Sequence, residues 1–129
     1  MILLAALALA AGQAAHDPRC DSPRTPDLDA CAGADWQRAD AAMNAEYRRV
    51  MAQMKAEDAH PQPDATTGPT YAQALLASQR AWLAFRDAEC LNDSYKYRGG
   101  TMQDMEELSC KANLTKARTK QIHDLTVTP

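Results

Sequence analysis

The stretch Gln79-Arg80-Ala81-Trp82-Leu83-Ala84-Phe85-Arg86-Asp87-Ala88-Glu89-Cys90 decides how this chain of 129 residues folds. A helix advances about 100° per residue, so one third of its circumference collects a single stripe of side chains. The stripe here consists of Leu75, Leu76, Gln79, Trp82, Leu83, Arg86 and Cys90. A buried polar group without a partner costs about 1–3 kcal/mol, so a core-facing stripe normally excludes such groups. This helix therefore needs specific polar partners elsewhere in the chain.

Two further helical segments flank this one, and no stretch shows the alternation of a β-strand. We expect a first helix from residue 26 or 35 to residue 57, a second over 70–97 and a third over 101–125. Proline and glycine residues in the segment that follows the first helix, and the pair Gly99-Gly100, end the helices. The sequence predicts an all-α fold, a small antiparallel three-helix domain.

The first two helices bring matching polar residues to the same height. If the chain folds back near residue 63, Asp40 lies opposite Arg86 and Tyr47 opposite Gln79. The first helix also has one stripe, made of Trp36, Asp40, Met43, Asn44, Tyr47, Met51 and Met54. Folding about Gly100 sets Trp82 level with Arg118. We therefore expect a buried polar layer that contains Asp40, Asn44, Tyr47, Gln79, Arg86 and Arg118.

The cysteines Cys20, Cys31, Cys90 and Cys110 indicate two disulfides, because a core of this size is marginal without covalent crosslinks. Folding about Gly100 sets Cys90 level with Cys110, which favours a Cys90–Cys110 bond and leaves Cys20 with Cys31. The alternative, Cys31–Cys90 with Cys20–Cys110, remains open if the first helix begins at Asp35. Sequence alone does not decide the connectivity.

The first 14 residues form an uncharged apolar run followed by small residues, which is typical of a secretory signal peptide with cleavage near 14/15. The domain then spans residues 20–125, and no further segment is apolar enough to cross a membrane. The net charge is −3, without a cluster of Lys or Arg. These features predict a periplasmic or secreted protein that does not bind nucleic acid and that favours cationic partners.

No catalytic, cofactor-binding or metal site can be assembled from the sequence, so we expect a binding protein rather than an enzyme. The serines lack a nucleophile-elbow setting, the cysteines are expected to be paired, and His16, His60 and His123 are scattered. Met51, Met54 and His60 invite a Cu(I)-binding hypothesis. Methionines at helical spacing are more often core residues, and we interpret them so.

Taken together, the motifs resemble the LprI-like lysozyme-inhibitor family of small bacterial envelope proteins. The residues that carry the resemblance are Cys20, Cys31, Asp40-x-x-Met43-Asn44-x-x-Tyr47, Gln79-Arg80-Ala81-Trp82, Phe85-Arg86-Asp87-Ala88-Glu89-Cys90, Gly99-Gly100-Thr101, Cys110 and Thr115-x-x-Arg118. The chain has Thr25-Pro26 where the family often has Thr-Gln. The resemblance implies an all-helical envelope domain whose best-known associated activity is inhibition of lysozyme.

The leading hypothesis is an inhibitor that covers the cleft of lysozyme or another cationic muramidase, with electrostatic attraction assisting the encounter. The expected contact regions are the loops 57–69 and 95–104. Their candidate contact residues are Glu57, Asp58, Asp64, Tyr95, Arg98 and Asp104. The alternative is an envelope adaptor or stress-related binding module that has no effect on lysozyme.

Overall fold

The computed structural model describes residues 15–60 and 67–125. The expected signal peptide and Asp64 lie outside the described residues. Five elements follow one another: η1 (Pro18–Asp21), α1 (Thr25–Asp58), α2 (Tyr71–Ser94), η2 (Tyr95–Tyr97) and α3 (Gln103–His123). The described residues contain helices and no strand, which confirms the all-α, three-helix prediction. None of the described helices is both long and apolar enough to cross a membrane.

The first helix, α1, runs unbroken from Thr25 to Asp58. Pro26 lies in its first turn, where the missing backbone N–H would have had no helical partner in any case. The helix continues through Gly33, which packs toward the side chain of Leu108 on α3. Of the two predicted starts, the one near residue 26 is therefore correct and the restart at residue 35 is wrong.

The second helix, α2, begins with a capping box in which Thr70 and Gln73 exchange side-chain and backbone hydrogen bonds. It ends at Ser94, earlier than the predicted residue 97, and the last three residues tighten into the 3₁₀ turn η2. Gly99 has φ +76°, a conformation that glycine adopts without strain. This glycine lets the chain reverse into α3, which ends two residues before the predicted residue 125.

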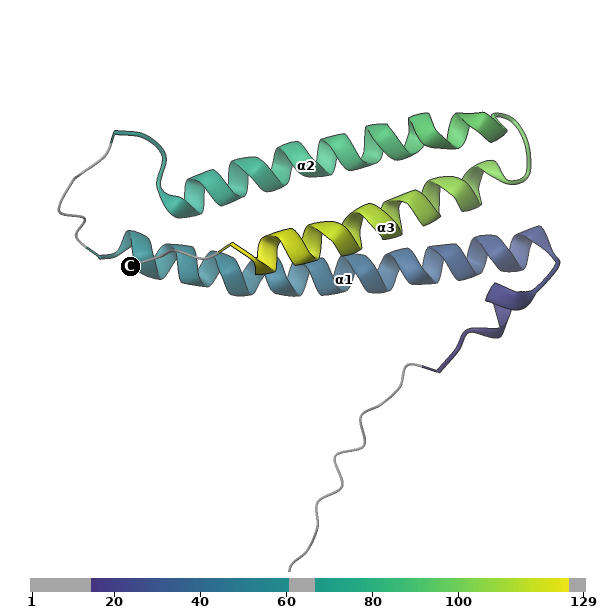
Figure 1. Ribbon diagram of the computed structural model, residues 1–129, viewed down its shortest axis with the longest axis horizontal. Coiled ribbons are helices and arrows are strands. Elements are labelled where there is room, and N and C mark those ends of the chain that lie inside the picture. The colour runs from purple at the N-terminus through teal and green to yellow at the C-terminus, as the bar shows by residue number, and fades with distance from the viewer. Residues whose placement is uncertain (1–14, 61–66, 126–129) are drawn as a thin grey trace, which may run out of the picture.

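Figure 1 shows α2 running in the opposite direction to both α1 and α3, as the short connections require. The closest packing joins α1 and α3, which are parallel and not consecutive in the chain. The sequence pattern predicted that α1 packs on α2 and did not indicate this contact. The apolar core lies in the half of the bundle that contains the α1–α2 connection. Its buried members are Met43, Val50, Met54, Leu75 and Ile122. Leu76, expected in the core, is 38% exposed.

Candidate functional site at the disulfide end

The middle of the bundle is organised around Arg86, whose side chain is 7% exposed. Its Nη1 donates to Asp40 Oδ1 at 3.1 Å and to Thr115 Oγ1 at 3.3 Å. Its Nε donates to Asp87 Oδ1 at 2.9 Å. The Asp40 side chain is 36% exposed, so water also reaches this carboxylate. The pair lies at the edge of the core and is less buried than the helical stripes predicted.

Two tryptophan rings enclose the Arg86 guanidinium. Its Cζ lies 5.7 Å from the ring centroid of Trp36 and 5.5 Å from that of Trp82. The Nζ of Lys111 lies 5.3 Å from the ring centroid of Trp36, and the Cζ of Arg118 lies 5.7 Å from that of Trp82. Cations near aromatic faces gain about 0.5–2 kcal/mol each, depending on desolvation. The three helices are therefore held in register by cations and aromatic rings as well as by the ion pair.

The remaining members of the predicted polar layer are distributed differently. Gln79 is buried, accepts from Arg118 Nε at 3.0 Å and donates to Met43 Sδ at 3.5 Å. Partial burial lowers the pKa of Arg118 from its usual value. Asn44 is exposed and donates to Asp40 Oδ2 at 3.1 Å. Tyr47 packs against the apolar core instead of hydrogen bonding to Gln79. Thr115 is fully buried in this layer and was missed as a member.

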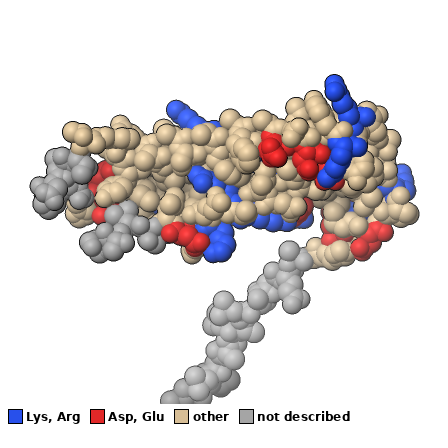
Figure 2. Space-filling model, turned by 45° about the horizontal axis from the view of Figure 1, so that its top comes forward, with Lys and Arg blue, Asp and Glu red and all other residues tan. Residues whose placement is uncertain are grey.

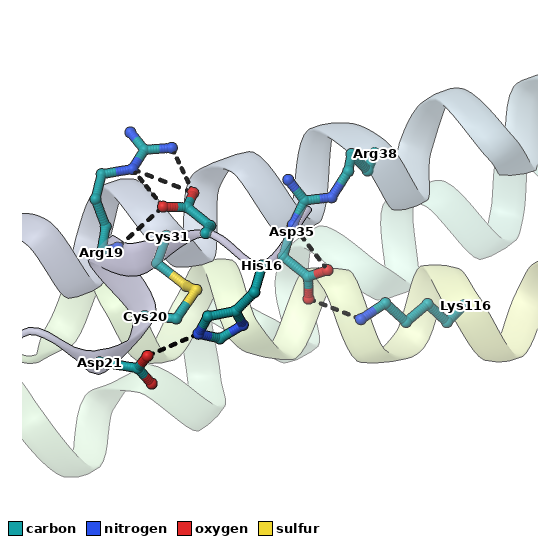
Figure 3. Close-up of a disulfide and its surroundings, with 9 residues drawn as sticks. His16, Arg19, Cys20, Asp21, Cys31, Asp35, Arg38 and Lys116 are labelled. Atoms are coloured by element: carbon teal, nitrogen blue, oxygen red, sulfur yellow. Dashed lines mark hydrogen bonds and ion pairs between the residues drawn. A yellow bond between two sulfur atoms is a disulfide. The ribbon is translucent and has the colours of Figure 1, made fainter. Parts of the chain in front are cut away.

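Two disulfides lie in the half of the bundle where α1 begins, α2 ends and α3 begins, which we term the disulfide half. Cys90–Cys110 joins α2 to α3 with a Cα–Cα distance of 5.4 Å, and Cys20–Cys31 joins η1 to α1 at 5.2 Å. This is the connectivity that the sequence favoured, and the alternative pairing is wrong. Figure 3 shows Cys20–Cys31 holding η1 against α1.

Charged pairs surround the Cys20–Cys31 bond (Figure 3). Arg19 donates to Asp17 at 2.6 Å, and this hydrogen bond lowers the pKa of Asp17 to about 2. The Nε2 of His16 lies 2.7 Å from the Oδ2 of Asp21. Lys116 on α3 lies 2.7 Å from Asp35 on α1, so an ion pair ties these two helices together on the surface. The Cys20–Cys31 bond thereby holds the segment that precedes α1 to the bundle, while the Arg19–Asp17 and His16–Asp21 pairs lie within that segment.

Charge is unevenly distributed along the bundle when it is divided at the Arg86–Asp40 pair. The disulfide half comprises residues 15–39 and 87–114, with eleven carboxylates and six basic side chains, a net charge of −5. The opposite half comprises residues 41–60, 67–85 and 115–125, with four carboxylates and seven basic side chains, a net charge of +3. The overall charge of −3 conceals this separation. A cationic partner is therefore attracted to the disulfide half.

The turn between α2 and α3 forms an open hollow of about 460 Å³, the turn hollow, lined by residues 95–98 and 100–102. Tyr95 and Tyr97 on its wall are 42% and 41% exposed. The guanidinium of Arg98 lies 4.8 Å from the Tyr95 ring centroid, and Lys96 pairs with Glu106 at 2.6 Å. Tyrosine and arginine are enriched at the centres of protein interfaces. The turn hollow thus has the composition of a contact surface.

The described parts of the two predicted contact loops, residues 57–60 and 67–69 of the first and 95–104 of the second, lie at opposite ends of the bundle and do not form one surface (Figure 1). Tyr95, Arg98 and Asp104 are exposed in the disulfide half. Glu57 and Asp58 are half-buried at the far end. Asp58 accepts hydrogen bonds from the backbone amides of Tyr71 at 2.8 Å and Ala72 at 2.9 Å. Burial acts to raise the pKa of Asp58, but the bonds from these amides outweigh it and leave the pKa below its usual value. Asp58 therefore anchors the start of α2.

The residues of the Cu(I)-binding hypothesis have different surroundings. Met54 is buried in the apolar core and Met51 packs against it, whereas His60 is exposed. Among the described residues, no group of three or more His, Cys, Asp or Glu side chains is placed to hold a metal ion. Both methionines thus have the surroundings of core residues.

The fold and these sites define a small all-α domain with two crosslinks, an acidic disulfide half and a basic opposite half. The family model described as "Lysozyme inhibitor LprI" matches residues 18–122, and the chain belongs to this family. An uncharacterized protein of Rhizobium meliloti (strain 1021) is 37% identical over 99 residues, which cover 77% of this chain and 71% of the relative. No solved structure matches the chain.

Proposed function

We propose that this protein inhibits lysozyme by binding it with the acidic disulfide half. The observation that carries the proposal is the net charge of −5 on the half that also presents the turn hollow, in a member of the lysozyme-inhibitor family. Complementary charge accelerates encounter and orients the partners, so an acidic surface suits a cationic enzyme. The proposed partner is a cationic muramidase.

The contact surface is centred on the turn hollow. Tyr95 and Tyr97 supply large side chains that lose little conformational freedom on binding. The exposed carboxylates of Glu89 and Asp104 have no ion-pair partner among the described residues. Both are therefore available to basic side chains of the enzyme. The Cys90–Cys110 bond limits the motion of this surface, which reduces the ordering cost of binding.

Arg98 has a separate role in the proposed complex. Glycoside hydrolases that cleave polysaccharides use a pair of carboxyl groups that flank the scissile bond. Arg98 is an exposed cation at the rim of the turn hollow, positioned over the Tyr95 ring in the half whose net charge is −5. In the complex its guanidinium faces the catalytic carboxylates, while the surrounding acidic side chains contact the basic surface of the enzyme. The protein then blocks the cleft without catalysing a reaction.

A muramidase assay tests this proposal. Oxidised protein is titrated against lysozymes of several types at low and moderate salt, and we expect stoichiometric inhibition that weakens as salt rises. Asp104→Lys reverses a charge on the contact surface and is expected to weaken inhibition about tenfold. Glu57→Lys makes the same change at the opposite end and should leave inhibition unchanged. Undiminished muramidase activity under excess oxidised protein would contradict the proposal and favour the envelope-adaptor alternative.

We also propose that the protein acts in the periplasm or outside the cell, after removal of the signal peptide. The two disulfides support an oxidising compartment, because such bonds are rare in reducing ones. Mass spectrometry of the exported chain tests this proposal, and we expect it to begin near residue 15. A cytoplasmic chain of full length with reduced cysteines would contradict it.

A further inference from the structure

The outward face of α2 lacks charge over its full length. Along an outward arc of about 150°, residues 71–94 present no Asp, Glu, Lys or Arg. The solvent-facing sides of the other helices do carry charge, such as Arg48 and Lys55 on α1 and Lys116 and Lys120 on α3. Exposed helix faces of water-soluble domains are normally charged or polar. Figure 2 shows mostly uncharged atoms across the side of the molecule where α2 lies.

This face combines small and large apolar side chains. The exposed alanines are Ala74, Ala77, Ala81, Ala84 and Ala88, spaced so that they follow one line along the helix. Phe85 and Leu91 lie on the same face and are 53% and 41% exposed. Phe85 is the single phenylalanine of the chain, and more than half of its surface is left in water. A line of alanines lets a second helix approach closely, and the two large side chains give it something to pack against.

We propose that a second copy of this chain covers this face, with the two α2 helices packed antiparallel about a two-fold axis at Ala84. At this register the residue numbers of facing positions sum to about 168, which places Ala84 against its own copy. Ala77 then lies level with Leu91 of the second copy, so a small residue meets a large one. The match is reciprocal, as a two-fold axis requires.

Charge complementarity selects a second copy in this orientation. Arg80 and Asp87 lie on one flank of the uncharged face, seven positions apart, and at the same register Arg80 lies level with Asp87 of the second copy. In an antiparallel helix pair, side chains of the same flank meet, so two identical ion pairs form. Arg80 is exposed, and Asp87 is 56% exposed although it also accepts from Arg86. A parallel pairing would set like charges at equal height.

The charge separation along the whole bundle favours the same orientation. The antiparallel dimer places the half of net charge −5 of one copy beside the half of net charge +3 of the other. A single helix pair buries less surface than a typical stable interface, so the dimer is expected to be weak and reversible. This inference does not rest on the proposed function.

Sedimentation equilibrium of the oxidised protein over a range of concentrations tests the proposal. The wild-type chain is expected to dimerise, and Ala84→Glu should raise the dissociation constant at least about a hundredfold by facing two carboxylates at the axis. Ala117→Glu adds the same charge to an exposed alanine of α3 and should leave dimerisation unchanged. Circular dichroism shows that each variant is folded. A wild-type chain that stays monomeric at about 1 mM would overturn the proposal, as would a dimer that Ala84→Glu does not weaken.

A charge exchange tests the antiparallel register. Arg80→Glu should weaken the dimer because it faces Asp87 of the second copy, and the double variant Arg80→Glu/Asp87→Arg should restore dimerisation to within about tenfold of wild type. Unfolding is measured in parallel, because Asp87 also contacts Arg86. A folded double variant that dimerises no better than Arg80→Glu alone would overturn the antiparallel arrangement.

Discussion

The two halves of this bundle are held together in different ways. The half that contains the α1–α2 connection buries Met43, Val50, Met54, Leu75 and Ile122 against one another. The disulfide half buries mainly small residues, among them Ala32, Cys90, Ser94 and Ala112, and carries both crosslinks. A domain this short has too few large apolar residues to fill both halves. In the disulfide half, which carries the net charge of −5, the two disulfides therefore take the place of a large apolar core. The proposed contact surface lies in the same half.

The packed half should respond most strongly to the loss of a core side chain. Ile122 is fully buried in the apolar cluster that joins residues of all three helices, so Ile122→Ala is expected to cost about 3–4 kcal/mol in the free energy of unfolding. Leu125, 40% exposed, provides the control, and Leu125→Ala should change the stability by less than about 0.5 kcal/mol. Urea denaturation measures both. Similar losses in the two variants would show that the packed half does not depend on this core.

The disulfide half should respond to removal of its crosslink. Cys90 and Cys110 close a loop with a sequence separation of 20, and the double variant Cys90→Ala/Cys110→Ala is expected to lose about 3 kcal/mol. Amide hydrogen exchange gives the location of the effect. We expect faster exchange in residues 87–110, while residues 43–54 keep most of their protection. An even loss of protection along the chain would contradict the division into two halves.

The layer between the halves should show an intermediate effect. Arg86→Ala removes the hydrogen bond to Thr115 and the cation between the two tryptophan rings, and should cost about 2–3 kcal/mol. Arg86→Met keeps an unbranched chain between the rings and should cost less. Asp40 is partly hydrated, so Asp40→Asn should cost less than about 1 kcal/mol. Thermal unfolding ranks the three variants. Equal costs for Arg86→Ala and Asp40→Asn would mean that the ion pair, and not the enclosure by Trp36 and Trp82, dominates this layer.

The sequence predicted the parts of this structure that depend on local pattern and on counting along the chain. The three helices were predicted from their stripes of side chains and from two breaks, at Gly99-Gly100 and near residue 63. The correct Cys90–Cys110 disulfide was favoured because the two cysteines were expected at the same height on neighbouring helices. Pairing of α1 with α3 was missed because these helices are parallel and not consecutive, so no turn fixes their register. The sequence placed Trp36 and Trp82 in the helical stripes but did not predict that their rings enclose Arg86, since a ring that faces a cation leaves no periodic signal.

The candidate site was only partly predictable for a related reason. Exposure of the loops could be inferred from proline and glycine, which is how Tyr95, Arg98 and Asp104 were selected. The charge separation along the bundle appears only when distant segments are assigned to one end or the other. Asp58 was selected as a contact residue, but it binds the first amides of α2, a tertiary contact that the sequence does not reveal.

The smallest expected effect is a pH dependence in the packed half. The hydrogen bond from Arg49 lowers the pKa of Glu46 to about 2; burial opposes this shift, and His123 at 3.0 Å adds to it. The folded pKa lies below the unfolded value of 4.5, so Glu46 stabilises the protein above about pH 4.5. This stability is lost as the pH falls from about 4.5 to about 2. Glu46→Gln should therefore lower the melting temperature at pH 6 and make the melting temperature less sensitive to acid between about pH 4.5 and pH 2.

Because Glu46 links α1 to α3 far from both disulfides, reduction of the disulfides should leave the difference in melting temperature between Glu46→Gln and wild type intact. A difference that disappears on reduction would show that the two halves unfold as one cooperative unit.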